Sequence, residues 1–167
     1  MNEKLDLTPL GNAVNRLAEG IARYETDITD TQIRDGLIQR FEFSYEISHK
    51  MLKRHLEAVS PTPEQFDGMA FADLVRSGNE QGLLLGDWSK WRNYREMRSK
   101  TSHTYDEDIA IEVVHGIPAF LEEARYLLLL RPDEVLSGIL NTPILEVAHN
   151  ALRILLQHHH MSAGCVA

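Results

Sequence analysis

Apolar side chains recur at steps of three and four residues along most of this chain, and that spacing restricts the fold more than any other feature of the sequence. In an α-helix, this spacing places the apolar residues on one face, where they can be buried together. No segment shows the sustained alternation of apolar and polar residues that is typical of a half-buried β-strand. The pattern therefore predicts an all-α protein built from amphipathic helices.

Start and stop signals divide this pattern into separate helices. Thr8 and Asp87 are expected to cap the first and fourth helices. Thr104 and Glu107 have the spacing of a capping box that would start the last helix. The run that begins at Thr101 contains poor helix formers, so the fourth helix is expected to end or bend there. The expected helices cover residues 8–28, 31–59, 64–78, 88–100 and 104–128.

Composition restricts the class of protein further. The single cysteine, Cys165, excludes a disulfide framework within one chain. No apolar run approaches the ~18 residues of a membrane span, and the N-terminus lacks the basic and apolar regions of a signal peptide. The net charge of -8 argues against a protein that coats nucleic acid with its whole surface. We therefore expect a cytoplasmic protein that does not bind membranes.

One basic cluster departs from this acidic balance. It is interleaved with Trp91 and Tyr94, a mixture that is found at nucleic-acid interfaces and also on solvated helix faces. Together with the neighbouring Trp88, these aromatic residues are expected to anchor the core or a dimer interface rather than to stack on bases. The candidates for contacts to a phosphate backbone are Lys90, Arg92, Arg95 and Lys100.

The segment from Arg98 to Tyr105 carries the residues best suited to chemistry on a phosphodiester. Arginine presents a permanently charged fork to phosphate oxygens, and histidine exchanges protons near neutral pH. Such a pair can cleave RNA, because His103 can take or supply a proton while Arg98 stabilises charge at phosphorus. On a regular helix the two side chains would point about 140 degrees apart, so only a helix end or kink can bring them together.

The same residues also have a purely structural interpretation. Arg98 would form a salt bridge with Asp106 or Asp108, and His103 would cap a helix. Spacing alone favours this structural interpretation.

Three blocks occur in a fixed order, and FLEEARYLL closes the domain after them. The blocks are IQRFEFSYEISHKMLKRHLE, GDWSKWRNY and REMRSKTSHTYDE. The last block contains the pattern R-x4-H-x-Y, formed here by Arg98, His103 and Tyr105. Residues 8–130 thereby resemble the HEPN family, in the branch that is encoded beside a minimal nucleotidyltransferase and called nucleotidyltransferase substrate-binding proteins.

This resemblance implies an up-and-down bundle of four to five helices that forms a homodimer, with the two R-x4-H-x-Y segments facing one another. It implies a metal-independent endoribonuclease toxin with RNA as substrate, no cofactor, and Arg98 and His103 as catalytic residues. The implied partner is a minimal nucleotidyltransferase antitoxin that transfers AMP to Tyr105. An adenylylated Tyr105 would place a bulky anion beside Arg98 and compete with the RNA phosphate.

Two positions depart from the pattern of the branch. Ser99 stands where Asn usually follows the motif arginine, which changes the hydrogen bonding that orients Arg98. His49 stands where the earlier block normally has Trp, so the packing at this position is expected to differ.

The resemblance ends near residue 131 and divides the chain into two expected parts. Residues 1–131 are expected to form the HEPN-like bundle, and residues 132–167 a C-terminal helical extension of unknown role. The extension carries His158, His159 and His160. Consecutive histidines on a helix diverge by about 100 degrees each, so no metal site is expected there.

Three functions remain open at this point. The first is the ribonuclease toxin. The second is a non-catalytic subunit that binds a nucleotide or substrate, or presents Tyr105, for the nucleotidyltransferase. The third is a structural adaptor that neither cleaves RNA nor accepts AMP.

Overall fold

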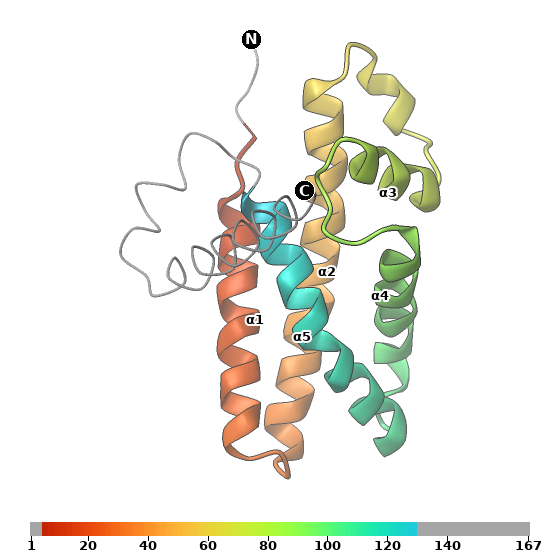
Figure 1. The fold of residues 1–167 in the computed structure, drawn as a ribbon. Coiled ribbons are helices and arrows are strands. Elements are labelled where there is room, and N and C mark those ends of the chain that lie inside the picture. The colour runs from red at the N-terminus through yellow and green to blue at the C-terminus, as the bar shows by residue number, and fades with distance from the viewer. Residues whose placement is uncertain (1–4, 130–167) are drawn as a thin grey trace, which may run out of the picture. The chain divides into compact units, whose positions relative to one another are not determined.

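The computed structural model describes residues 5–129, which form five α-helices and two short 3₁₀-helices (Figure 1). These residues contain no β-strand, so the all-α prediction is confirmed for this part of the chain. The predicted extension over residues 132–167, with its histidines and Cys165, lies outside the described residues. The α-helices are α1 (Thr8–Thr26), α2 (Thr31–Val59), α3 (Phe71–Glu80), α4 (Trp88–Lys100) and α5 (Glu107–Leu129), and the 3₁₀-helices are η1 (Pro63–Phe66) and η2 (Thr101–His103).

The four long helices α1, α2, α4 and α5 form an up-and-down bundle, and the short α3 lies at the side of it (Figure 1). The central helix is α2, which packs against each of the other four α-helices. An ion pair between Arg34 and Glu107 joins the start of α2 to the start of α5. The connection from α4 to α5 therefore lies at the end of the bundle where α1 turns into α2 (Figure 1).

Aromatic rings fill the core where α2, α4 and α5 meet. Phe41 of α2 meets Phe120 of α5 edge to face at 5.1 Å between ring centroids, and Tyr94 of α4 meets Phe120 at 5.3 Å. Each such pair contributes roughly 0.5–1.5 kcal/mol beyond the burial of its area. Trp91 and Tyr94 are buried, as expected of core anchors, whereas Trp88 is half-buried. This cluster holds α4 against α2.

The boundaries of α1 differ from those expected. Thr8 is the first residue of the helix rather than its cap, and its backbone N–H donates to the carboxylate of Asp6 at 2.9 Å. The helix ends at Thr26, and Ile28 is exposed. The apolar pattern thus ran past the helix end, where Asp27 accepts hydrogen bonds from Thr29 in the turn instead.

The helix predicted over residues 64–78 is wrong, because two shorter elements, η1 and α3, cover this region. Gly68 lies between them and disfavours a continuous helix. The second element extends to Glu80 and closes at Gly82, whose φ of 70° is a left-handed conformation that suits glycine.

Two helix starts near the motif rest on aspartate caps. Asp87 accepts from the N–H of Lys90 at 3.2 Å, which confirms the predicted cap of α4. Asp106 caps α5, because its carboxylate accepts from the N–H groups of Asp108 and Ile109. The capping box expected at Thr104 is therefore wrong. An aspartate directly before the helix accepts from the free N–H groups of its first turn instead.

Candidate functional site

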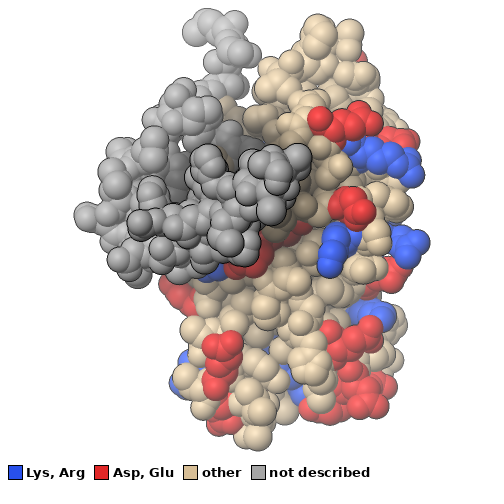
Figure 2. Space-filling view, in the orientation of Figure 1, with Lys and Arg blue, Asp and Glu red and all other residues tan. Residues whose placement is uncertain are grey.

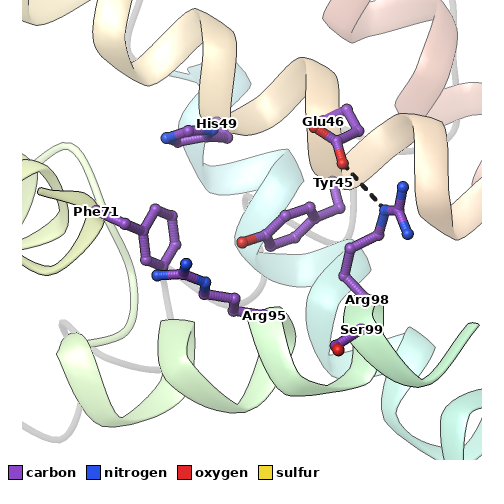
Figure 3. Close-up of a pocket in the computed structure, with 7 residues that line it drawn as sticks. All are labelled: Tyr45, Glu46, His49, Phe71, Arg95, Arg98 and Ser99. Carbon is purple, nitrogen blue, oxygen red and sulfur yellow. Dashed lines mark hydrogen bonds and ion pairs between the residues drawn. The ribbon is translucent and has the colours of Figure 1, made fainter.

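Arg98 lies in the last turn of α4 and points toward α2 (Figure 3). Its Nε donates to Glu46 Oε1 at 3.0 Å, and its Nη1 lies 2.9 Å from Glu42 Oε1. Nη1 also donates to the Thr101 hydroxyl at 3.2 Å. Among residues 5–129, its other terminal nitrogen, Nη2, forms no hydrogen bond. Arg98 is thus fixed in direction and keeps one nitrogen for an external anion.

The salt-bridge partners expected for Arg98 were wrong. Neither Asp106 nor Asp108 contacts it; Glu42 and Glu46 do, from the facing helix. These two carboxylates and His49 follow at steps of four and three residues, so they share one face of α2. That polar stripe was visible in the sequence. Local sequence does not say which helix the stripe faces.

His103 and Tyr105 lie at the break between α4 and α5. His103 is the last residue of η2, and its side chain is exposed. Tyr105 is 88% exposed, the largest exposure among the large hydrophobic side chains of the described residues. The two rings meet nearly at right angles, with centroids 6.1 Å apart. Both side chains are therefore accessible to a macromolecule.

The expected end of α4 near Thr101 is confirmed, and it brings His103 to Tyr105 rather than to Arg98. Within the part of the chain that the structure describes, no hydrogen bond or ion pair joins Arg98 to His103. Arg98 instead faces the carboxylates of α2. One chain by itself therefore does not assemble an arginine–histidine pair.

A hollow of about 310 Å³ lies beside Arg98, between α2, α3 and α4 (Figure 3). Burial raises the pKa of the Tyr45 hydroxyl to about 12, so this group stays protonated at neutral pH. Burial lowers the pKa of His49, which favours its neutral form. The hollow is lined by Tyr45, Glu46, His49, Phe71, Arg95, Arg98 and Ser99.

Comparison with known proteins identifies the family. Residues 5–130 match a family described as nucleotidyltransferase substrate binding protein like. The chain belongs to this family. The nucleotidyltransferase-associated branch that was predicted from the sequence is thereby confirmed.

The chain is also similar to one named protein and to one solved structure. The chain is 38% identical over 136 residues to a protein of Haemophilus influenzae named probable ribonuclease HepT; the match covers 77% of this chain and 92% of the relative. A solved structure from Haemophilus influenzae is described as the fold of a substrate-binding domain of a nucleotidyltransferase. It matches with a TM-score of 0.69 and 36% identity, over 74% of this chain and 96% of that chain.

The basic cluster of this family member is spread around α4 rather than gathered on one face. Arg95 lies one turn before Arg98 on the side of the hollow, with its guanidinium 4.9 Å from the Phe71 ring centroid. Arg92 pairs with Glu96, and Lys100 pairs with Glu112 of α5. On the face shown in Figure 2, acidic and basic side chains alternate without a continuous positive patch.

Glu123 is a residue whose role the sequence did not reveal. It is 1% exposed, and its carboxylate accepts from Trp91 Nε1 at 3.0 Å and from the N–H groups of Leu85 and Gly86. Burial raises the pKa of this carboxyl group above its usual value. Because it ties α5 to the loop before α4, Glu123 fixes where α4 begins and hence where its basic end lies.

Within residues 5–129, no group of three or more His, Cys, Asp or Glu side chains is arranged to hold a metal ion. None of the helices in this part of the chain is long and apolar enough to cross a membrane.

Proposed function

We propose that this protein is the ribonuclease toxin of a toxin–antitoxin pair, which acts in the cytoplasm as a homodimer and cleaves RNA without a metal ion. The carrying observation is the arrangement of Arg98, held by two carboxylates with Nη2 unpaired, close in sequence to an exposed His103. The 38% identity to a protein named probable ribonuclease supports the same assignment.

The proposed reaction uses the 2′-hydroxyl of RNA as nucleophile. Its oxygen attacks the adjacent phosphorus, the bond from phosphorus to the 5′-oxygen breaks, and a 2′,3′-cyclic phosphate and a 5′-hydroxyl end result. His103 takes the proton from the 2′-hydroxyl while water protonates the leaving 5′-oxygen, or it protonates the leaving oxygen while water accepts the 2′-hydroxyl proton. Arg98 stabilises the negative charge on the phosphoryl oxygens as the transition state forms.

A composite site in a homodimer accounts for the separation of the two residues within one chain. In a two-fold dimer the same surface of each protomer meets the other, so the exposed His103 of one copy can approach Arg98 of its partner. The break between α4 and α5 would then lie at the dimer interface.

Tyr105 is proposed as the acceptor of AMP from a partner nucleotidyltransferase. Its side chain is 88% exposed, so a second enzyme can reach the hydroxyl. Its ring contacts that of His103, so an added phosphate would lie near this proposed catalytic residue and repel the RNA backbone. Transfer would thus switch the ribonuclease off.

Arg95 is the best supported of the proposed RNA contacts, because it shares the hollow with Arg98. Lys90, Arg92 and Lys100 stay predictions as backbone contacts. Each phosphate contact that is lost should weaken binding and reduce the dependence of affinity on salt.

Cleavage of RNA in EDTA tests this proposal. Purified wild-type protein should yield 5′-hydroxyl ends, and His103→Ala should reduce the rate about 10²–10⁴-fold, the range typical of a general acid or base. Cleavage that persists undiminished in His103→Ala would show that this histidine is not catalytic. No cleavage by the wild type at all would overturn the proposed function.

A second candidate function is a non-catalytic subunit that binds substrate for the nucleotidyltransferase. It is favoured by the name of the matched family and by the acidic partners that already occupy part of the Arg98 fork. It predicts AMP on Tyr105 without RNA cleavage. Mass spectrometry after incubation with the nucleotidyltransferase and ATP, with Tyr105→Phe compared against Tyr126→Phe, separates it from an adaptor that accepts no AMP.

A further inference from the structure

Aromatic rings and one guanidinium group line the hollow beside Arg98. Phe71 is half-buried, with the Arg95 guanidinium over its ring and the His49 ring at 72° to it, 5.1 Å away between centroids. Arg95 is exposed on its outer side and forms no ion pair within residues 5–129. An arginine plane held on an aromatic ring is a surface on which a flat ring can stack.

The same hollow contains polar groups that the protein itself leaves unused. Tyr45 is 5% exposed, and its hydroxyl points into the hollow without a hydrogen-bond partner among the described residues (Figure 3). The nitrogens of His49 likewise form no hydrogen bond there, although the residue is partly buried. The Tyr45 hydroxyl and the His49 nitrogens are not among the fully buried side-chain atoms that lack a partner, so solvent reaches both groups, and both are open to hydrogen bonds from a ligand in the hollow.

The hollow lies beside Arg98, so a ligand bound in it would place an attached phosphate next to this arginine. Arg95 and Arg98 are three residues apart on α4, so they lie on one side of the helix. Arg98 also lines the hollow, and its Nη2 forms no hydrogen bond within residues 5–129, so it is an anion-binding group beside the surface formed by Arg95 and Phe71. A flat ring with hydrogen-bonding edges and an attached phosphate fits both features, and a nucleotide has this chemistry.

We infer that the hollow binds one nucleobase of the RNA strand, the base attached to the phosphate that Arg98 contacts. The base extends the stack of Phe71 and Arg95, and its edge bonds to the Tyr45 hydroxyl and the His49 imidazole. This inference rests on the proposed function, and it assigns Phe71, Arg95, Tyr45 and His49 to substrate selection. The volume of about 310 Å³ lies at the lower end for small-molecule sites, which suits a single base.

The base next to the bound phosphate should therefore affect affinity independently of cleavage. His103→Ala keeps the RNA intact, so binding can be measured on this chain with a short single-stranded RNA. A set of RNAs, each abasic at one position, should contain one member that binds about tenfold more weakly, since stacking contributes about 1–3 kcal/mol per base.

A second substitution, added to the His103→Ala chain, tests whether the base binds in the hollow. Phe71→Leu keeps an apolar side chain but removes the ring, and Arg95→Gln removes the charge and the guanidinium plane. Either change should abolish the difference between the intact and the abasic RNA. Arg23→Gln on α1, which does not line the hollow, is the matched control and should preserve the difference.

His49→Phe keeps the ring contact with Phe71 and removes only the hydrogen-bonding nitrogens. It should change which base is preferred at the selected position while retaining the stacking effect. Thermal unfolding is measured for each variant as a control. A melting temperature close to that of the wild type means that a loss of selectivity is not caused by unfolding.

The results separate this inference from the proposed function. An abasic penalty that survives in both Phe71→Leu and Arg95→Gln would overturn the hollow as a base site, even if the wild type cleaves RNA. AMP is the probe for a free nucleotide. If the variants lose AMP binding but discriminate abasic RNA as before, the hollow serves free nucleotides and the inference is wrong. A wild type that selects the base but never cleaves would overturn only the proposed function.

Discussion

Arg98 occupies an unusual position for a residue that is to bind phosphate, because two carboxylates already contact it. Glu42 and Glu46 direct the guanidinium and reduce its net attraction for anions at the same time. A lysine carries its three donors on a single nitrogen, so it lacks the separate nitrogens with which the planar arginine fork faces Glu42, Glu46 and an anion in different directions. The shape of the arginine therefore matters as much as its charge.

Arg98→Lys tests whether the shape of this side chain matters in addition to its charge. The charge is retained, but the fork that contacts Glu42 and Glu46 and is proposed to bind the phosphate is lost. We expect kcat/KM for RNA cleavage to fall about 10²–10³-fold, the loss that follows removal of one donor that stabilises a transition state. Cleavage kinetics under single-turnover conditions measure the effect, with Arg23→Lys on α1 as control. A rate close to that of the wild type would show that charge alone suffices.

The aspartate caps at the starts of α4 and α5 help to fix the position of the segment from Arg98 to Tyr105. Asp87 caps the first, and Asp106 caps the second directly after Tyr105. The cap fixes the end of the exposed turn that carries His103 and Tyr105. Loss of the cap would allow this turn to fray.

Asp106→Ala is therefore expected to lower the free energy of unfolding by about 1 kcal/mol, the usual effect of removing a helix cap. Thr104→Ala is the informative comparison, because the capping box read from the sequence would assign the larger loss to Thr104. Among the described residues, its hydroxyl donates to the carbonyl oxygen of Thr101 and accepts from no helix N–H group. Urea unfolding measures both variants, and a larger loss in Thr104→Ala would contradict the observed cap.

The sequence predicted the helices better than their contacts. Apolar spacing predicted the long helices, and the family signature pointed to Arg98 and Tyr105. The spacing did not show that Gly68 divides the third segment, because apolar residues continue on both sides of it. The partners of Arg98 were missed for a different reason: Glu42 lies more than fifty residues away, and only the packing of α4 on α2 brings them together.

Glu123 of α5 stabilises the fold, because its buried carboxylate accepts hydrogen bonds from the loop before α4 and from Trp91 of α4. In Glu123→Gln, the amide would place a donor against an N–H donor of Leu85 or Gly86, because both carboxylate oxygens now accept. We expect the free energy of unfolding at neutral pH to fall by about 1–3 kcal/mol, the cost of leaving a buried polar group unpaired. Chemical unfolding measures this loss, and an unchanged midpoint would contradict the role assigned to Glu123.

The pH dependence of the same variant has a defined sign. Burial raises the pKa of Glu123 in the folded state above its ordinary value of 4.5, so the folded state binds this proton more tightly than the unfolded state. The stability contributed by that proton is complete below pH 4.5 and is lost as the pH rises through the raised value. Glu123→Gln should lack this decline, whereas Glu122→Gln, the exposed neighbour, should retain it.

At the scale of the whole molecule, the proposed site requires two chains. A dimer of Arg98→Ala lacks both arginines, and a dimer of His103→Ala lacks both histidines, so each protein alone should be inactive. A mixed dimer has an arginine in one chain and a histidine in the other. If catalysis pairs residues across the interface, co-expression of the two chains should restore cleavage to well above either parent.

A catalytic site formed within one chain predicts the opposite result. If Arg98 and His103 of the same chain acted together, each protomer of the mixed dimer would lack one of them and no activity would return. As a control, a chain with both Arg98→Ala and His103→Ala is co-expressed with the wild type. The mixed dimer then contains one intact protomer and one protomer that lacks both residues. Dissociation on dilution should remove the restored activity in step with the loss of dimer, because the catalytic pair exists only while the two chains are joined.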